Sequence, residues 1–70
     1  MSDNAKRLKI EAIIDENFGR EIDAPEKLAQ EAANQNCADS VALGEFEVWS
    51  DDFYDCWLST YGSVLEEINQ

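Results

Sequence analysis

The chain has 70 residues, and its 44% hydrophobic and 10% aromatic residues are enough to form the core of one small folded domain, residues 1–70. Sixteen acidic residues against five basic ones give a net charge of −11, and histidine, the commonest general base and a preferred zinc ligand, is absent. Because there is no long apolar run, we expect no membrane span and no secretory signal, and therefore a cytoplasmic protein.

Catalytic and metal-binding chemistry has little support in this sequence, and we expect no catalytic residue, no metal and no cofactor. Asp51, Asp52 and Asp55 are oxygen ligands, but their spacing lacks the alternation and the turn glycine of a calcium loop. Cys37 and Cys56 have no basic neighbour in the sequence that would lower a thiol pKa. In a reducing cytoplasm we expect both cysteines to be free thiols.

The first predicted helix covers residues 4–18. It follows Ser2 and Asp3, which are favourable N-capping residues, and it stops at Gly19. Apolar residues at i, i+3 and i+4 predict its buried stripe, which consists of Ile10, Ile13, Ile14 and Phe18.

A second helix is predicted after Asp23, which can cap it, with Pro25 in its first turn and Glu26 three residues after the cap. Its apolar seam has small side chains: Leu28, Ala29, Ala32 and Ala33. The polar stretch 34–37 is predicted to end this helix, and Asp39 or Ser40 to begin a short third helix that Gly44 closes. Residues 45–49 (EFEVW) are expected to form an extended linker or a helical turn, with a short strand as the alternative.

The last helix is predicted to follow Ser50, a good N-cap, with Asp51 and Asp52 in the first turn, where the helix dipole favours acidic residues. At about 100° per residue, one side of this helix is apolar: Phe53, Tyr54, Trp57, Leu58, Tyr61, Val64, Leu65 and Ile68. The other side is polar: Asp52, Asp55, Ser59, Glu66 and Glu67, with Asp51 at the border. We therefore predict an all-α fold, a small bundle of three to four helices with a possible short extended segment at 45–49.

The negative charge is unevenly distributed along the chain. Residues 1–20 have four acidic and four basic residues, whereas residues 21–70 have twelve acidic residues and only Lys27. Opposite charges at i, i+4 would stabilise a solvated helix, but no positive side chain follows Lys27, which suggests a face of one sign that attracts a basic partner. Carboxylates at i, i+3 and i+4 lie about 5 to 6 Å apart at the β-carbon, a spacing comparable to that of phosphates along a nucleic-acid strand.

In its short length, strong acidity, few lysines, helical content and rows of Asp and Glu, the chain resembles the DNA-mimic inhibitors of phages and mobile elements, which include anti-CRISPR and anti-restriction proteins. The resemblance implies a non-catalytic inhibitor that blocks a basic DNA- or RNA-binding protein or complex and does not itself bind nucleic acid. If a phage encodes it, the protein would act in the cytoplasm of the host cell. The partner-binding residues would be Asp51, Asp52, Asp55, Glu66 and Glu67, flanked by Glu45, Glu47 and Trp49, with Glu26 and Glu31 as weaker candidates.

Two other interpretations stay open at this point. The chain could be a protein-interaction adaptor in which Trp49, Phe53 or Trp57 fills an apolar pocket and the acidic residues form a rim. Alternatively, the acidity could serve only solubility, since added Asp and Glu keep a small domain soluble. The sequence is compatible with a monomer or a homodimer.

Overall fold

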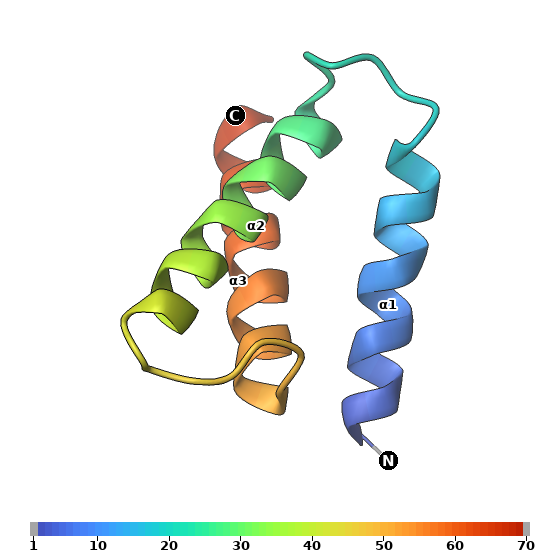
Figure 1. Ribbon diagram of the computed structural model, residues 1–70. Helices are drawn as coiled ribbons and strands as arrows, with labels where there is room; N and C mark the ends of the chain where they lie inside the picture. Colours follow the sequence, from blue (N-terminus) through green and yellow to red (C-terminus); the bar gives the residue numbers. More distant parts are fainter. Residues whose placement is uncertain (1, 70) are drawn as a thin grey trace.

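Three α-helices joined by two loops make up the computed structural model, which describes residues 2–69 and, within them, the side chains of residues 5–69. The helices are α1 (Ser2–Asn17), α2 (Pro25–Ala42) and α3 (Asp51–Ile68). Figure 1 shows α1 and α3 running in the same direction and α2 running opposite to both, so that the two ends of the chain lie at opposite ends of the bundle. Residues 2–69 contain no strand. The predicted all-α fold is confirmed, with three helices.

Helix α1 starts two residues before the predicted Asn4, and the expected capping side chains of Ser2 and Asp3 lie outside the described side chains. Ile10 is fully buried and Ile13 and Ile14 pack against the core. The prediction for Phe18 is wrong, because this residue follows the last helical residue and is 87% exposed.

Asn17 occupies the place on α1 that the apolar pattern had assigned to Phe18. It lies seven residues after Ile10, two helical turns along the same face, and only 2% of it is exposed. Its Nδ2 atom donates hydrogen bonds to the Gln30 side chain at 2.8 Å and to the Glu26 carbonyl oxygen at 3.2 Å. A buried amide therefore ties the end of α1 to the start of α2.

Helix α2 is a single helix, so the predicted break at residues 34–37 and the separate short helix after it are both wrong. Its N-cap is Ala24, which makes no side-chain capping bond, rather than Asp23. The C-terminal end is as predicted at Gly44, which has a positive φ of 81° that glycine tolerates. There the amide of Gly44 bonds to the carbonyl of Val41 and the amide of Glu45 to that of Ser40, which is a Schellman motif.

The break was predicted because residues 34–37 are a polar stretch, in which the two asparagines are weak helix formers. The buried seam of α2 nevertheless continues through this stretch, since Ala29, Ala33 and Cys37 follow one another at intervals of four residues and all three are fully buried. Leu28 was predicted on the seam but lies largely outside it, with 41% of its surface exposed. Burial along one face therefore overrides the local preference of residues 34–37.

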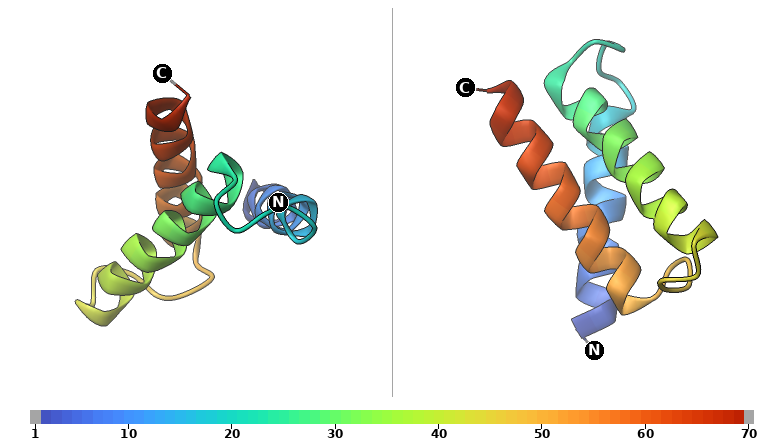
Figure 2. Two further views of the ribbon diagram at one scale, coloured as in Figure 1. Left: turned by 90° about the horizontal axis from the view of Figure 1, so that it is seen from above. Right: turned by 90° about the vertical axis from the view of Figure 1, so that its left-hand side faces the viewer.

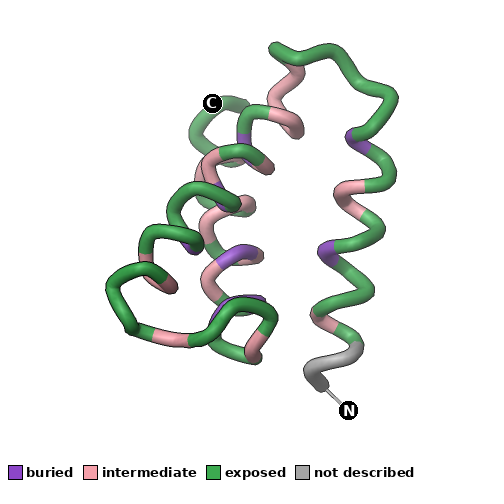
Figure 3. Tube along the Cα trace, in the orientation of Figure 1, coloured by how far each residue is buried: buried purple, intermediate pink, exposed green. Residues whose placement is uncertain are grey.

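The core lies mainly between α2 and α3, which share the most extensive contact, while α1 packs chiefly on α3. Figure 2 shows α1 set apart from the crossed pair of α2 and α3. In Figure 3 the buried positions face the inside of the bundle and the outer faces of all three helices are exposed. The aromatic side of α3 supplies Phe53, Tyr54 and Trp57, which pack with Ile10 and Ala33 as predicted.

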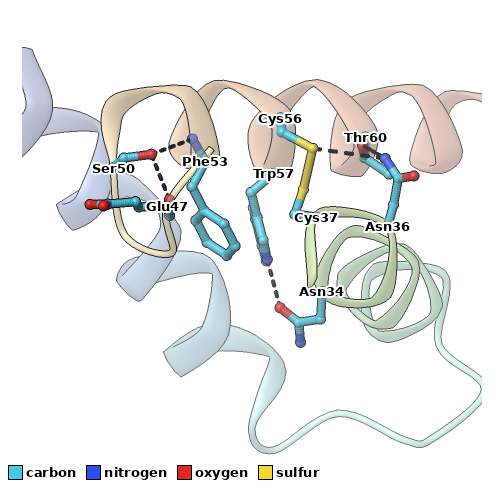
Figure 4. Close-up of a disulfide and its surroundings, with 9 residues drawn as sticks. All are labelled: Asn34, Asn36, Cys37, Glu47, Ser50, Phe53, Cys56, Trp57 and Thr60. Carbon is cyan, nitrogen blue, oxygen red and sulfur yellow. Dashed lines mark hydrogen bonds between the residues drawn. A yellow bond between two sulfur atoms is a disulfide. The ribbon is translucent and has the colours of Figure 1, made fainter. Parts of the chain in front are cut away.

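A disulfide bond joins Cys37 of α2 to Cys56 of α3, so the expectation of two free thiols is wrong for this structure. The Cα atoms of the pair are 6.1 Å apart, within the ordinary range for a disulfide. Cys37 is fully buried, whereas Cys56 is half-buried and its sulfur lies 3.8 Å from the Asn36 amide nitrogen (Figure 4). The pairing was not evident from the sequence because it depends on how the buried seam of α2 crosses α3.

Candidate functional site

The loop between α2 and α3 and the first turns of α3 hold five of the predicted partner-binding carboxylates. Residues 45–49 form bends and turns with neither strand nor helix, so the possible extended segment is not formed. Ser50 closes the loop, because its hydroxyl donates to the Glu47 carbonyl at 2.6 Å and accepts from the Phe53 amide at 3.3 Å (Figure 4). Ser50 is therefore the predicted N-cap, and it fixes the loop relative to the helix.

Two of the three aspartates at the start of α3 have a partner that the sequence alone did not reveal. The Lys6 Nζ atom of α1 lies 3.1 Å from Asp51 and 2.9 Å from Asp55. The Asp55 and Asp51 carboxylates accept hydrogen bonds from Lys6 and so raise the pKa of this lysine. Asp51 and Asp55 stay about half exposed, at 47% and 58% of the side chain.

The contact with Lys6 corrects part of the charge argument. No basic residue follows Lys27 in the sequence, but the fold brings a lysine from α1 against the aspartates of α3. Asp52, the third aspartate, is exposed, and it lies three residues before Asp55 on the outer side of α3. The surface at this end is thus still acidic, with less negative charge than three aspartates alone would give.

The structure does not bring all of the predicted acidic residues together. Glu45 and Glu47 are exposed in the loop next to the start of α3, whereas Glu66 and Glu67 are exposed in its last turns. At 1.5 Å per residue, Asp51 and Glu66 are separated by about 20 Å along the helix. The outward positions between Asp55 and Glu66 are Ser59, Gly62 and Ser63. The carboxylates therefore form two groups, one at each end of α3, and not one continuous row.

Trp49 is the aromatic residue of this site that faces solvent. It is 54% exposed, whereas Phe53 and Trp57, the other two predicted anchors, are buried. The indole of Trp57 in α3 donates a 2.7 Å hydrogen bond to the side-chain oxygen of Asn34, an exposed residue of α2 (Figure 4). Of the three residues considered as aromatic anchors, only Trp49 is accessible to a partner.

The backbone and ring packing of Trp49 hold its side chain in place. Its φ angle is +60°, the left-handed region that a bulky residue rarely adopts. Its ring centroid lies 5.2 Å from that of Phe53 and 6.2 Å from that of Tyr54, within the usual range for aromatic pairs. Phe46 supports the same group by packing edge-on against Phe53. Nothing in the sequence signals the positive φ at this position.

A hollow of about 190 Å³ lies beside Trp49, lined also by Arg7 and Glu11 of α1. Arg7 and Glu11 form the i, i+4 pair typical of an exposed helix face, with the Arg7 Nε atom 3.2 Å from a Glu11 carboxylate oxygen. Their position next to Trp49 depends on the packing of α1 against the α2–α3 loop, so it could not be read from the sequence.

Within the described residues, no group of three or more Cys, Asp or Glu side chains is arranged to hold a metal ion. None of the three helices, as far as the described residues extend, combines the length and apolar character needed to cross a bilayer.

Comparison with known proteins gives no assignment: no protein-family model, no curated protein and no solved structure matches the chain.

Proposed function

We propose that the protein is a non-catalytic inhibitor that occupies a basic, nucleic-acid-binding surface of another protein or complex, as the anti-CRISPR and anti-restriction DNA mimics do. The observation that carries this proposal is the exposed acidic surface at the start of α3, formed by Glu45, Glu47 and Asp52, in a chain of net charge −11. Such a surface attracts a cationic groove and disfavours contact with nucleic acid.

The gap in the middle of α3 restricts the form that this mimicry can take. A nucleic-acid strand presents phosphates at regular short intervals, whereas here the two carboxylate groups are separated by about 16 Å of helix, from Asp55 to Glu66. The proposal therefore assigns recognition to the acidic end formed by the loop and the start of α3. Glu66 and Glu67 make up a second, separate contact.

The test compares capture of partners from a host lysate by the parent protein and by the variant Glu45→Gln/Glu47→Gln. The matched control is Asp15→Asn/Glu16→Gln, which removes two exposed carboxylates of α1. We expect capture to fall with salt and with the loop variant, and to change little with the control. Each captured protein is then tested for displacement of its own DNA or RNA by the parent protein.

Two outcomes would contradict the proposal. The loop variant could capture the same partners as the parent protein, or the captured partners could keep their nucleic acid in the presence of the parent protein.

The second candidate function, an adaptor anchored by an aromatic residue, is favoured by the half-exposed Trp49. An adaptor of this kind would bind a neutral partner, resist salt and lose binding when Trp49 alone is replaced. The salt dependence therefore separates the two functions.

A further inference from the structure

We propose that the hollow between α1 and the α2–α3 loop binds a single arginine or lysine side chain of a partner protein, with the cationic group between the Trp49 indole and the Glu11 carboxylate. This inference deepens the proposed function and rests on it for the identity of the partner, which is a basic protein. The binding of a cationic side chain is itself testable without that partner.

The size of the hollow is suited to one side chain. Its volume of about 190 Å³ is below the range of about 300–1,000 Å³ of pockets that hold small-molecule ligands. A volume of liquid water of this size corresponds to about six molecules. One long side chain that enters from a partner surface is therefore a more suitable occupant than a cofactor or a metabolite.

Trp49 is arranged to present an aromatic face at this place. A left-handed backbone at a bulky residue costs free energy, and such conformations concentrate at binding sites, where the surrounding structure enforces them. Phe53 and Tyr54 support the Trp49 ring, while the bonds of Ser50 to the loop and the helix fix the turn that follows it. The indole is thus preorganised, and little side-chain freedom is lost on binding.

The charges around the hollow favour a cation. Tryptophan is the best aromatic partner for arginine or lysine, and Glu11 supplies a carboxylate beside it. The wider field is negative because of the chain's net charge of −11. Arg7 is the one opposing charge in the lining; its pair with Glu11 is about half exposed on both sides, and such pairs contribute little stability. An incoming guanidinium can therefore take the place of Arg7 on the Glu11 carboxylate.

The test is a titration of ¹⁵N-labelled protein with the tripeptide acetyl-Gly-Arg-Gly-amide, followed by NMR. The two tryptophans give separate indole N–H signals, and buried Trp57, whose N–H is bonded to Asn34, is an internal reference. Acetyl-Gly-citrulline-Gly-amide is the matched neutral probe, and acetyl-Gly-Glu-Gly-amide the anionic one. We expect saturable shifts of the Trp49 signal with the arginine peptide, and much smaller shifts with the other two.

Substitutions in the lining of the hollow show whether it binds a cation or an anion. Glu11→Gln should weaken binding of the arginine peptide by up to about fivefold, the effect of losing one exposed ion pair, whereas Glu67→Gln, the same charge change at a distance, should have a smaller effect. Arg7→Gln should strengthen binding more than Lys9→Gln does, because Arg7 competes for Glu11. Trp49→Asn should abolish the saturable binding, since asparagine tolerates a positive φ but has no aromatic face; for this variant the backbone amide signals of Arg7 and Glu11 are followed in place of the indole signal.

Three results would overturn the inference: equal shifts with the arginine and citrulline peptides, loss of binding in Arg7→Gln together with binding of the glutamate peptide, or equal effects of Glu11→Gln and Glu67→Gln. The second of these would make the hollow an anion site. If the arginine peptide binds as expected but the lysate yields no basic partner, the proposed function fails and the cation site stands. If a basic partner is captured equally by the parent and by Glu11→Gln, the cation site fails and the proposed function stands.

Discussion

The disulfide between α2 and α3 should supply a large part of the stability of this small protein. Cys37 and Cys56 are 19 residues apart in the chain, and closing a loop of that length in the unfolded state corresponds to about 3 kcal/mol at 25 °C. A 70-residue domain has a total free energy of unfolding of roughly 4–10 kcal/mol, so reduction should remove a third or more of it. With an unfolding entropy of about 2.1 cal/mol/K per residue, the midpoint of thermal unfolding should fall by about 20 °C.

The assay is thermal and urea unfolding, followed by circular dichroism, of the oxidised protein, the reduced protein and the variant Cys37→Ala/Cys56→Ala. We expect the reduced protein to keep its helices at low temperature, because Trp57 and the alanine seam still hold α2 against α3. Intact mass should increase by two hydrogens on reduction of the monomer. Equal unfolding midpoints for the oxidised and reduced forms would refute the reasoning, and so would a protein that never loses two hydrogens under oxidising conditions.

The remaining predictions concern single side chains. Asn17→Ala should lower the free energy of unfolding by about 1–3 kcal/mol, because it removes a buried amide whose two part-buried acceptors, on Gln30 and Glu26, lose their donor; urea unfolding measures the loss. Lys6→Gln should lower the free energy of unfolding at neutral pH, because it removes the contact of Lys6 with Asp51 and Asp55. The two aspartates raise the pKa of Lys6 in the folded protein. The contact therefore stabilises the fold below the ordinary lysine pKa of about 10.4, and this stabilisation is lost as the pH rises through the pKa of Lys6 in the folded protein. A difference between parent and Lys6→Gln that does not shrink between pH 9 and pH 12 would contradict this. Glu66→Lys/Glu67→Lys should raise stability by about 0.5–2 kcal/mol, because the last turn of α3 has no basic residue to complement the helix dipole; an unchanged thermal midpoint would show that this end imposes no such cost.

The helices were predictable where the local signals and the burial pattern agree. Ser50 followed by two aspartates marks the start of α3, and its aromatic side is the buried side. At residues 34–37 the two signals conflict: the polar residues predict a break, while Cys37 continues the seam of Ala29 and Ala33. The structure follows the seam, because burial against α3 stabilises α2 more than the weak helix formers destabilise it.

The candidate site depends on contacts between distant parts of the chain, and these could not be predicted. Lys6 and Asp51 are 45 residues apart, so the sequence showed an acidic stretch with no nearby cation where the fold provides one. The hollow beside Trp49 likewise requires a residue of the α2–α3 loop and two residues of α1. Sequence patterns place residues on the faces of helices, but the packing of α1 decides which faces meet.

The structure separates the carboxylates that contribute to folding from those that do not. Asp51 and Asp52 lie in the first turn of α3, where the helix dipole favours negative charge, and Asp51 also contacts Lys6 together with Asp55. Folding therefore accounts for Asp51 and Asp55, whereas Asp52 has the favourable helix dipole but its exposed carboxylate is available to a partner. Folding does not account for Glu45 and Glu47, which are exposed in the α2–α3 loop and lie outside any helix. It does not account for Glu66 and Glu67 either, because negative charge is unfavourable at the C-terminal end of α3. These glutamates add to the self-repulsion of a chain with net charge −11, and the cationic partner of the proposed function would offset it; the loop glutamates, which lie outside any helix, are the better test of that proposal.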